Sequence, residues 1–98
     1  MALVIDSIEW PLEIEDKIIS KHGVEPSDVE SALLNTDPEP SWHKVDDGKY
    51  VALAQAEHSG EYLLVVFAVP RRGTARIISA RPMEPKEKAL FRRKRGIR

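Results

Sequence analysis

A change in hydrophobic spacing near residue 41 constrains the fold of this chain more than any other feature. Before it, apolar residues recur at helical intervals, with Ile14 and Ile18 on one face of a first stretch. From Trp42 onwards they alternate or run continuously, as strands require. Helices followed by consecutive strands, rather than strict alternation of the two, indicate an α+β fold with an antiparallel meander.

Turn residues and prolines divide the chain into eight expected elements in the order β-α-α-β-β-β-β-α. We expect strands at 3–10, 42–45, 49–56, 61–69 and 74–80, helices at 13–22 and 26–34, and a final helix from about 83 to 94. The apolar run 61–69 is typical of a central strand, and Pro82 should stop the last one. The prediction is a four- to five-stranded sheet with the helices packed on one face and the other face partly open.

Length and composition exclude several classes of protein. The 98 residues are expected to form one domain, 1–98. Because there is no cysteine, disulfides, thiolate catalysis and cysteine-based zinc sites are excluded. The three histidines lack ligand spacing, so neither a metal site nor a cofactor is expected. The longest apolar run is too short to cross a membrane and the first residues lack a basic signal-peptide region, so we expect a cytoplasmic protein.

Charge is strongly polarised along the chain. Residues 71–98 contain eleven Lys or Arg and two Glu, a net charge of +9, whereas residues 1–70 contain four basic and fourteen acidic residues, a net charge of −10. A basic segment of this kind predicts binding to phosphates or to an acidic partner. The opposite charges would also permit a homodimer in which the acidic part of one copy meets the basic part of another.

Several short segments carry a resemblance to a known family. They are Glu9-Trp10, Lys21-His22-Gly23-Val24, Gly48-Lys49-Tyr50 and Arg76-Ile77-Ile78-Ser79-Ala80-Arg81, followed by a helix with Glu87 and Phe91. In these segments the chain resembles the BrnT family of toxins from type II toxin–antitoxin modules, over about residues 8–93. The family more often has arginine at the position of Lys49 and tyrosine at that of Phe91.

The resemblance implies a RelE-like ribonuclease fold and a function. The expected activity is that of a metal-independent endoribonuclease, which cleaves RNA and thereby inhibits translation. The expected partners are an RNA substrate and a cognate antitoxin that would form a hetero-oligomer with the toxin. The departures at Lys49 and Phe91 leave open an alternative, a non-catalytic module that keeps the fold and binds RNA or protein.

RNA cleavage without a metal needs a base for the 2′-OH, a cation for the charged phosphorane and an acid for the leaving 5′-oxygen. Arginine suits the second role because its planar fork of donors matches phosphate oxygens. Arg76 and Arg81 are the candidates. They are five residues apart, so a regular strand would point them to opposite faces. Both could serve one site only with a bend or a strand end near Ala80. Arg76 would share the face of Ile78, where a charge without a partner is costly.

Three further residues are candidate catalytic residues with a structural alternative. Lys49 could join the arginines across the meander, or deter edge pairing at a hairpin. His22 could be the general base, although its place at a helix end next to Gly23 already suits a cation. Glu87 could orient an arginine of the last strand, or be ordinary surface charge on a helix.

The remaining candidates concern binding to the RNA chain. Arg71 and Arg72 in a turn, and Arg92 and Arg93 in the last helical turn, are candidate RNA-binding residues, although charges at such places are often only solvated. Trp10 and Trp42 could stack on bases, but in a chain of this size we expect them in the core.

Overall fold

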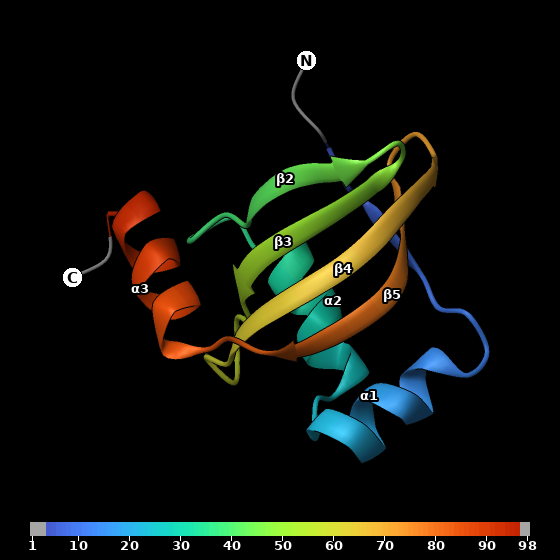
Figure 1. Ribbon diagram of the computed structural model, residues 1–98, viewed down its shortest axis with the longest axis horizontal. Helices are drawn as coiled ribbons and strands as arrows, with labels where there is room; N and C mark the ends of the chain where they lie inside the picture. Colours follow the sequence, from blue (N-terminus) through green and yellow to red (C-terminus); the bar gives the residue numbers. More distant parts are fainter. Residues whose placement is uncertain (1–3, 97–98) are drawn as a thin grey trace.

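The computed structural model describes residues 4–96 and contains a five-stranded sheet in the order β1-β5-β4-β3-β2 (Figure 1). Four strands form the antiparallel meander: β2 (Ser41–Asp46), β3 (Lys49–Gln55), β4 (Tyr62–Arg71) and β5 (Thr74–Pro82). The short β1 (Ser7–Glu9) pairs in parallel with β5. This architecture confirms the predicted α+β fold, its element order and the central position of β4.

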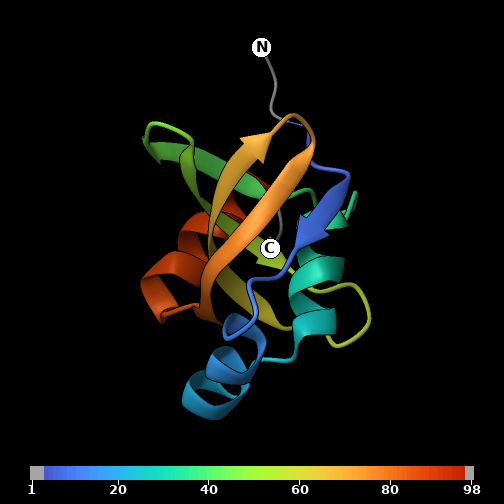
Figure 2. The same ribbon diagram turned by 90° about the vertical axis from the view of Figure 1, so that its right-hand side faces the viewer.

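Two helices cover one face of the sheet, as Figure 2 shows from the side. They are α1 (Ile14–His22) and α2 (Pro26–Leu34). Their buried residues Ile18, Val29 and Leu33 pack with Val65 and Phe67 of the central strand. Gly23 ends α1 in the left-handed conformation, with φ of 67°, which favours glycine at this position. Trp10 and Trp42 pack against this core as predicted.

The third helix, α3 (Pro85–Lys94), lies against the opposite face, so the prediction that all helices share one face is wrong. Its fully buried Phe91 forms a second apolar cluster with Leu53 and Met83. The ring of Tyr62 meets the ring of Phe91 edge-on, with centroids 6.1 Å apart. Helix α3 therefore closes one end of the second face and leaves the rest of that face open (Figure 1).

Element bounds differ from the prediction at a few ends. The strand expected at 3–10 is limited to Ser7–Glu9, and residues 1–3 and 97–98 lie outside the described part of the chain. Pro82 does not stop β5 but is its last residue, paired with Leu63. A proline is tolerated there because β1 reaches only as far as Arg76, so the outer edge of β5 carries no further strand ladder. None of the helices within residues 4–96 is long and apolar enough to span a bilayer.

Candidate functional site

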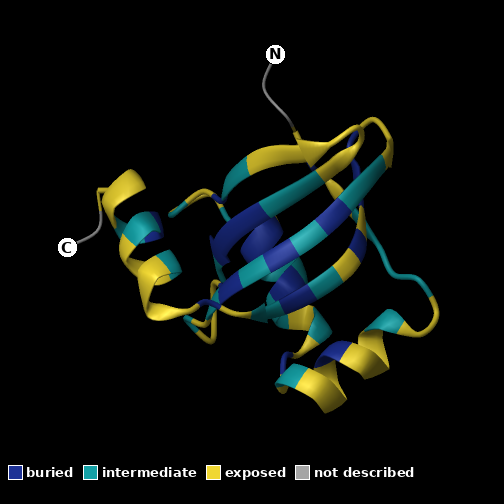
Figure 3. Cartoon of the chain, in the orientation of Figure 1, coloured by how far each residue is buried: buried dark blue, intermediate teal, exposed yellow. Residues whose placement is uncertain are grey.

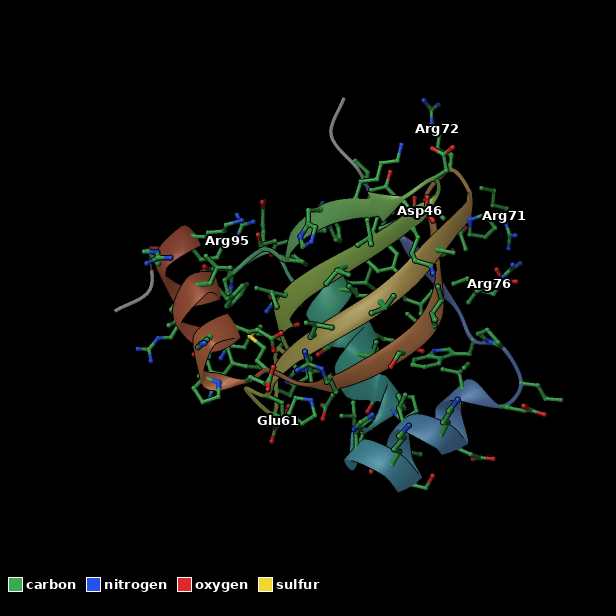
Figure 4. The ribbon with its side chains drawn as sticks, viewed as in Figure 1. Asp46, Glu61, Arg71, Arg72, Arg76 and Arg95 are labelled. Atoms are coloured by element: carbon green, nitrogen blue, oxygen red, sulfur yellow. The ribbon has the colours of Figure 1, made fainter. Side chains whose placement is uncertain are left out.

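The open face of the sheet carries most of the residues singled out from the sequence. Figure 3 shows half-buried and exposed positions alternating with buried ones along the strands. Several half-buried residues of β3 and β4 form an apolar surface opposite the helix-covered side, namely Val51, Leu64, Val66 and Ala68. Charged side chains surround this apolar surface and come mainly from β5 and from the ends of β3 and β4 (Figure 4).

A β-bulge in β5 places both candidate arginines on the open face. Phe67 of β4 pairs with Ile77, but the next residue back, Val66, pairs with Ser79, so Ile78 is an extra residue in the ladder. Such an insertion shifts the in–out alternation by one position. Arg76 pairs with Ala68 and Arg81 with Leu64, both of the open face. The bulge supplies the bend that the sequence required, but at Ile78 rather than at Ala80.

The same bulge corrects the expectation that Arg76 would be costly beside Ile78. Ile78 is not a core residue, since 37% of it is exposed to solvent. The buried neighbours on the helix side are Ala75, Ile77 and Ala80 instead. Arg76 is therefore an exposed residue of the open face rather than a charge pressed into the core.

Arg81 forms a bidentate ion pair with Glu87. Its Nη1 and Nη2 donate to Oε1 and Oε2 of Glu87 at 2.8 and 2.7 Å. Nη1 also donates to the carbonyl oxygen of Pro82 at 3.0 Å. Glu87 in turn accepts a hydrogen bond from the backbone N–H of Glu84 at 2.8 Å, as part of the capping box that begins α3. Glu87 thus ties the end of β5 to the first turn of α3.

This contact shifts the pKa of both partners. Hydrogen bonding to Arg81 lowers the pKa of Glu87 below its ordinary value, against the opposing effect of burial, and the Glu84 N–H adds to the lowering. The hydrogen bond from Glu87 raises the pKa of Arg81. Both groups therefore stay charged at neutral pH, and the guanidinium is fixed in one orientation.

Arg76 meets a different carboxylate at the edge of the sheet. Its Nε lies 3.4 Å from Oε2 of Glu9, the residue that pairs with it from β1. Nη2 of Arg71 lies 3.6 Å from the same oxygen. That oxygen is buried, yet it accepts no hydrogen bond from any residue of the described part of the chain. Arg71 and Arg76 project side by side from this edge in Figure 4.

Lys49 lies on the open face across one strand from Arg76. Ala68 of β4 pairs with Lys49 on one side and with Arg76 on the other, so about 10 Å separates the two backbones. The register thus places Lys49 near Arg76, as the interpretation of Lys49 as a catalytic residue requires. It also pairs with Asp46 beside the β2–β3 turn. Because β3 has a neighbouring strand on both sides, Lys49 does not lie on an edge strand and the edge-pairing interpretation does not fit its position.

The histidines divide between the two sides of the molecule. His22 is not part of the open face but ends α1, where it lines a cleft of about 250 Å³ with Ile78 and Ser79 of the bulge. His43 pairs with Val51 and so belongs to the open face, on the edge strand β2. It also lines a cavity of about 680 Å³ at that edge, together with Trp42, Tyr50 and Arg95. None of the predicted catalytic residues lines this larger cavity.

The four predicted RNA-binding arginines lie at the two ends of the open face. Arg71 ends β4 and Arg72 points away from the sheet at the β4–β5 turn (Figure 4). Arg92 and Arg93 lie in the last turn of α3. Arg95, the residue that follows the end of α3, donates through Nη2 to the carbonyl oxygen of Pro40 at 2.9 Å and so anchors the end of α3 to the loop before β2.

Two residues of the face were not singled out as functional from the sequence. Glu9 faces Arg76 only because β1 joins β5, a pairing across most of the chain that no local pattern reveals. Lys88 on α3 places its Nζ 5.1 Å from the centre of the Tyr62 ring, a cation–π contact. Tyr62 lies 26 residues before Lys88 in the sequence, so no local pattern predicts this contact.

Comparison with known proteins supports the architecture. No protein family profile and no curated protein sequence matches this chain. Among solved structures, the chain is similar to the Brucella abortus ribonuclease toxin BrnT, with a TM-score of 0.62 and 19% sequence identity. The match covers 80% of this chain and 96% of that one. The chain therefore has a BrnT-like fold.

Proposed function

We propose that this protein is the toxin of a type II toxin–antitoxin module and acts as a metal-independent endoribonuclease that inhibits translation. The observation that carries the proposal is the placement of Arg76 and Arg81 on one open face by the bulge at Ile78. The BrnT-like fold supports the same function, because the similar solved structure is that of a ribonuclease toxin.

The chemistry proposed for this face is an in-line transfer within the RNA chain. The 2′-oxygen attacks the adjacent phosphorus while the bond from phosphorus to the 5′-oxygen breaks. The 2′-OH proton passes to a base and an acid protonates the leaving 5′-oxygen, which gives a 2′,3′-cyclic phosphate and a 5′-hydroxyl end. Negative charge on the phosphorane oxygens is the part that arginine stabilises.

The residue roles follow from their positions. Arg76 and Arg81 pair with β4 residues that are four apart, so about 13 Å separates their backbones. Their side chains therefore contact different stretches of one RNA strand. Glu87 acts through Arg81 as its positioning residue. Lys49 provides a further cation beside Arg76, and His22 is the candidate base at the margin of the face. Arg71, Arg72, Arg92 and Arg93 attract the RNA backbone from the two ends.

The partner proposed for regulation is a cognate antitoxin protein that covers the basic face in a hetero-oligomer. An acidic surface would complement the net charge of +9 on residues 71–98. A reading frame for such a protein beside this one in the genome would support the assignment. A homodimer formed by the acidic and basic parts would show a molecular mass that falls as salt is raised.

The decisive experiment is RNA cleavage by the purified protein in EDTA. Arg76→Ala and Arg81→Ala should each reduce the rate, by about 100-fold or more where the arginine contacts the scissile phosphate. Lys44→Ala is the matched control, because Lys44 pairs with Tyr50 and belongs to the helix-covered side. Cleavage that survives the double arginine substitution would remove this site assignment.

A second function, binding without cleavage, is favoured by one specific observation. Both arginines already face carboxylates of the protein itself, Arg81 through Glu87 and Arg76 through Glu9. A module of this kind would bind RNA with strong salt dependence but would cause no growth arrest on expression. Toxicity that disappears with Arg76→Ala or Arg81→Ala would exclude it.

A further inference from the structure

A small cleft lies beside the open face where α1 packs against the bulged part of β5. It has a volume of about 250 Å³ and is lined by Lys17, Ile18, Lys21 and His22 of α1 and by Ile78 and Ser79 of β5. The cleft exists because β1 pairs with β5 only as far as Arg76, so α1 rather than a strand flanks the following residues (Figure 2). Its size is below the range of pockets that enclose a whole drug-sized ligand, but it suits a single charged group.

The polar side chains of this cleft are all donors or basic groups. Lys17 and Lys21 are one helical turn apart and lie on the same side of α1, and no carboxylate residue belongs to the lining. The ion pairs formed among residues 4–96 involve neither lysine. Arg71, Arg76 and Arg81, by contrast, each face a carboxylate. The cations that remain available for a ligand at this margin therefore lie on α1.

The cap of α1 reduces the repulsion that an anion would meet at the C-terminal end of this helix. The last carbonyl groups of a helix normally present partial negative charge, which repels an anion. Here the backbone N–H of Gly23 donates to the carbonyl oxygen of Ile19 at 2.9 Å, and that of Val24 to the carbonyl oxygen of Ile18 at 3.1 Å. These hydrogen bonds satisfy two of the carbonyl groups next to His22 and reduce that repulsion.

We propose that this cleft binds a phosphate group of the RNA chain, so that the bound RNA extends from the open face around the edge of β5. The inference rests on the proposed function, since it extends the same binding surface. Ser79 connects the two parts: its register partner Val66 places it on the open face between Arg76 and Arg81, and it also lines the cleft. An RNA strand that runs along β5 past Ser79 next contacts Lys17 and Lys21.

The test is the binding of a fluorescein-labelled 12-nucleotide RNA whose 2′-oxygens are methylated, so that it cannot be cleaved. Fluorescence anisotropy is measured between 50 and 300 mM salt for the wild type, for Lys21→Gln and for the double variant Lys17→Gln/Lys21→Gln. Lys44→Gln is the matched control, because it removes one exposed lysine from β2, the strand at the opposite edge of the sheet from β1 and β5. Circular dichroism checks that α1 remains folded, which is expected because both cleft lysines are exposed and glutamine is a good helix former.

The double variant should lose about fivefold to tenfold in affinity, and the slope of log K against log salt should become shallower by about 0.7 for one lost phosphate contact. Lys44→Gln should leave the slope unchanged. Inorganic phosphate should shift the amide NMR signals of His22 and Ser79 in the wild type and not in the double variant.

Three results would overturn the inference in distinguishable ways. RNA binding by the wild type with no change in the double variant refutes the cleft alone and leaves the proposed function standing. No RNA binding by the wild type refutes both. A poly-glutamate peptide that binds as tightly as RNA, with the same loss in the double variant, would assign the cleft to an acidic protein instead.

Discussion

The contact between Arg81 and Glu87 predicts a measurable and pH-dependent contribution to stability. Glu87→Gln keeps the size of the side chain but removes its charge. One of the two hydrogen bonds from Arg81 is then lost, and the other joins the charged guanidinium to a neutral amide oxygen instead of a carboxylate. Hydrogen bonds to charged groups stabilise by about 1.5–3 kcal/mol and neutral ones by about 0.5–1.5 kcal/mol. Because Glu87 is 23% and Arg81 33% exposed, solvent screening reduces this difference, and we expect a loss of about 1–2 kcal/mol at pH 7.

The sign of the pH dependence follows from the lowered pKa of Glu87. A carboxyl group whose pKa is lower in the folded than in the unfolded state stabilises the fold above its ordinary value, near 4.5 here. That stabilisation is lost as the pH falls through the pKa of the folded state. The difference in unfolding free energy between the wild type and Glu87→Gln should therefore be constant from pH 6 to 8 and shrink towards zero in strong acid.

Urea unfolding followed by circular dichroism measures this effect. For a chain of this size, 1–2 kcal/mol corresponds to a decrease of about 1 M in the urea midpoint. Glu61→Gln is the matched control, because Glu61 is exposed and its side chain forms no ion pair within residues 4–96, and it should change stability by less than about 0.5 kcal/mol. A loss that is equally large at pH 7 and in strong acid would refute the electrostatic reasoning.

Three further predictions concern the fold itself and can be checked by thermal or urea unfolding. Phe91→Ala should cost about 3–5 kcal/mol, because Phe91 is fully buried between α3 and the sheet; an effect below 1 kcal/mol would show that α3 does not pack there. Gly73→Ala should destabilise by more than about 1 kcal/mol, since φ is 81° and the added Cβ would lie 3.0 Å from Oδ1 of Asp6, whereas Gly96→Ala, with φ of 69° but no atom within 4 Å, should cost less. Trp10→Phe should cost about 1–3 kcal/mol by leaving Oε2 of Glu30 without its 2.7 Å hydrogen bond, and Glu30→Gln should largely keep the wild-type stability.

The sequence predicted the elements well because their signals are local. Pro26 begins α2 and Gly23 ends α1, as capping preferences require, and the two residues fix those ends without help from distant parts of the chain. The apolar run of β4 similarly identifies a strand with neighbours on both sides. The α+β class and the meander follow from these elements.

The arrangement of the candidate site could not be predicted, because it depends on long-range pairing. No glycine or proline marks the bulge at Ile78, and isoleucine is an ordinary strand residue, so its place in the register appears only when β4 is aligned with β5. Glu9 lies far from Arg76 in sequence and meets it only through the β1–β5 pair. The position of α3 on the second face likewise depends on the contact between Leu53 and Phe91. The hydrophobic spacing of the sequence does not show on which face of the sheet these two residues pack.

The parallel pairing of β1 with β5 has a consequence for the synthesis of the chain. The hydroxyl groups of Ser7 and Thr74, 3.1 Å apart in the folded protein, are separated by 67 residues of sequence. At about 5–20 residues per second, a ribosome needs about 3–13 s to add the residues between them. Throughout that interval β1 has no partner strand, and Glu9 has no arginine to neutralise it. The edge of the sheet that holds Arg76 is thus completed only after nearly the whole protein has been translated, so a growing chain is without its candidate site.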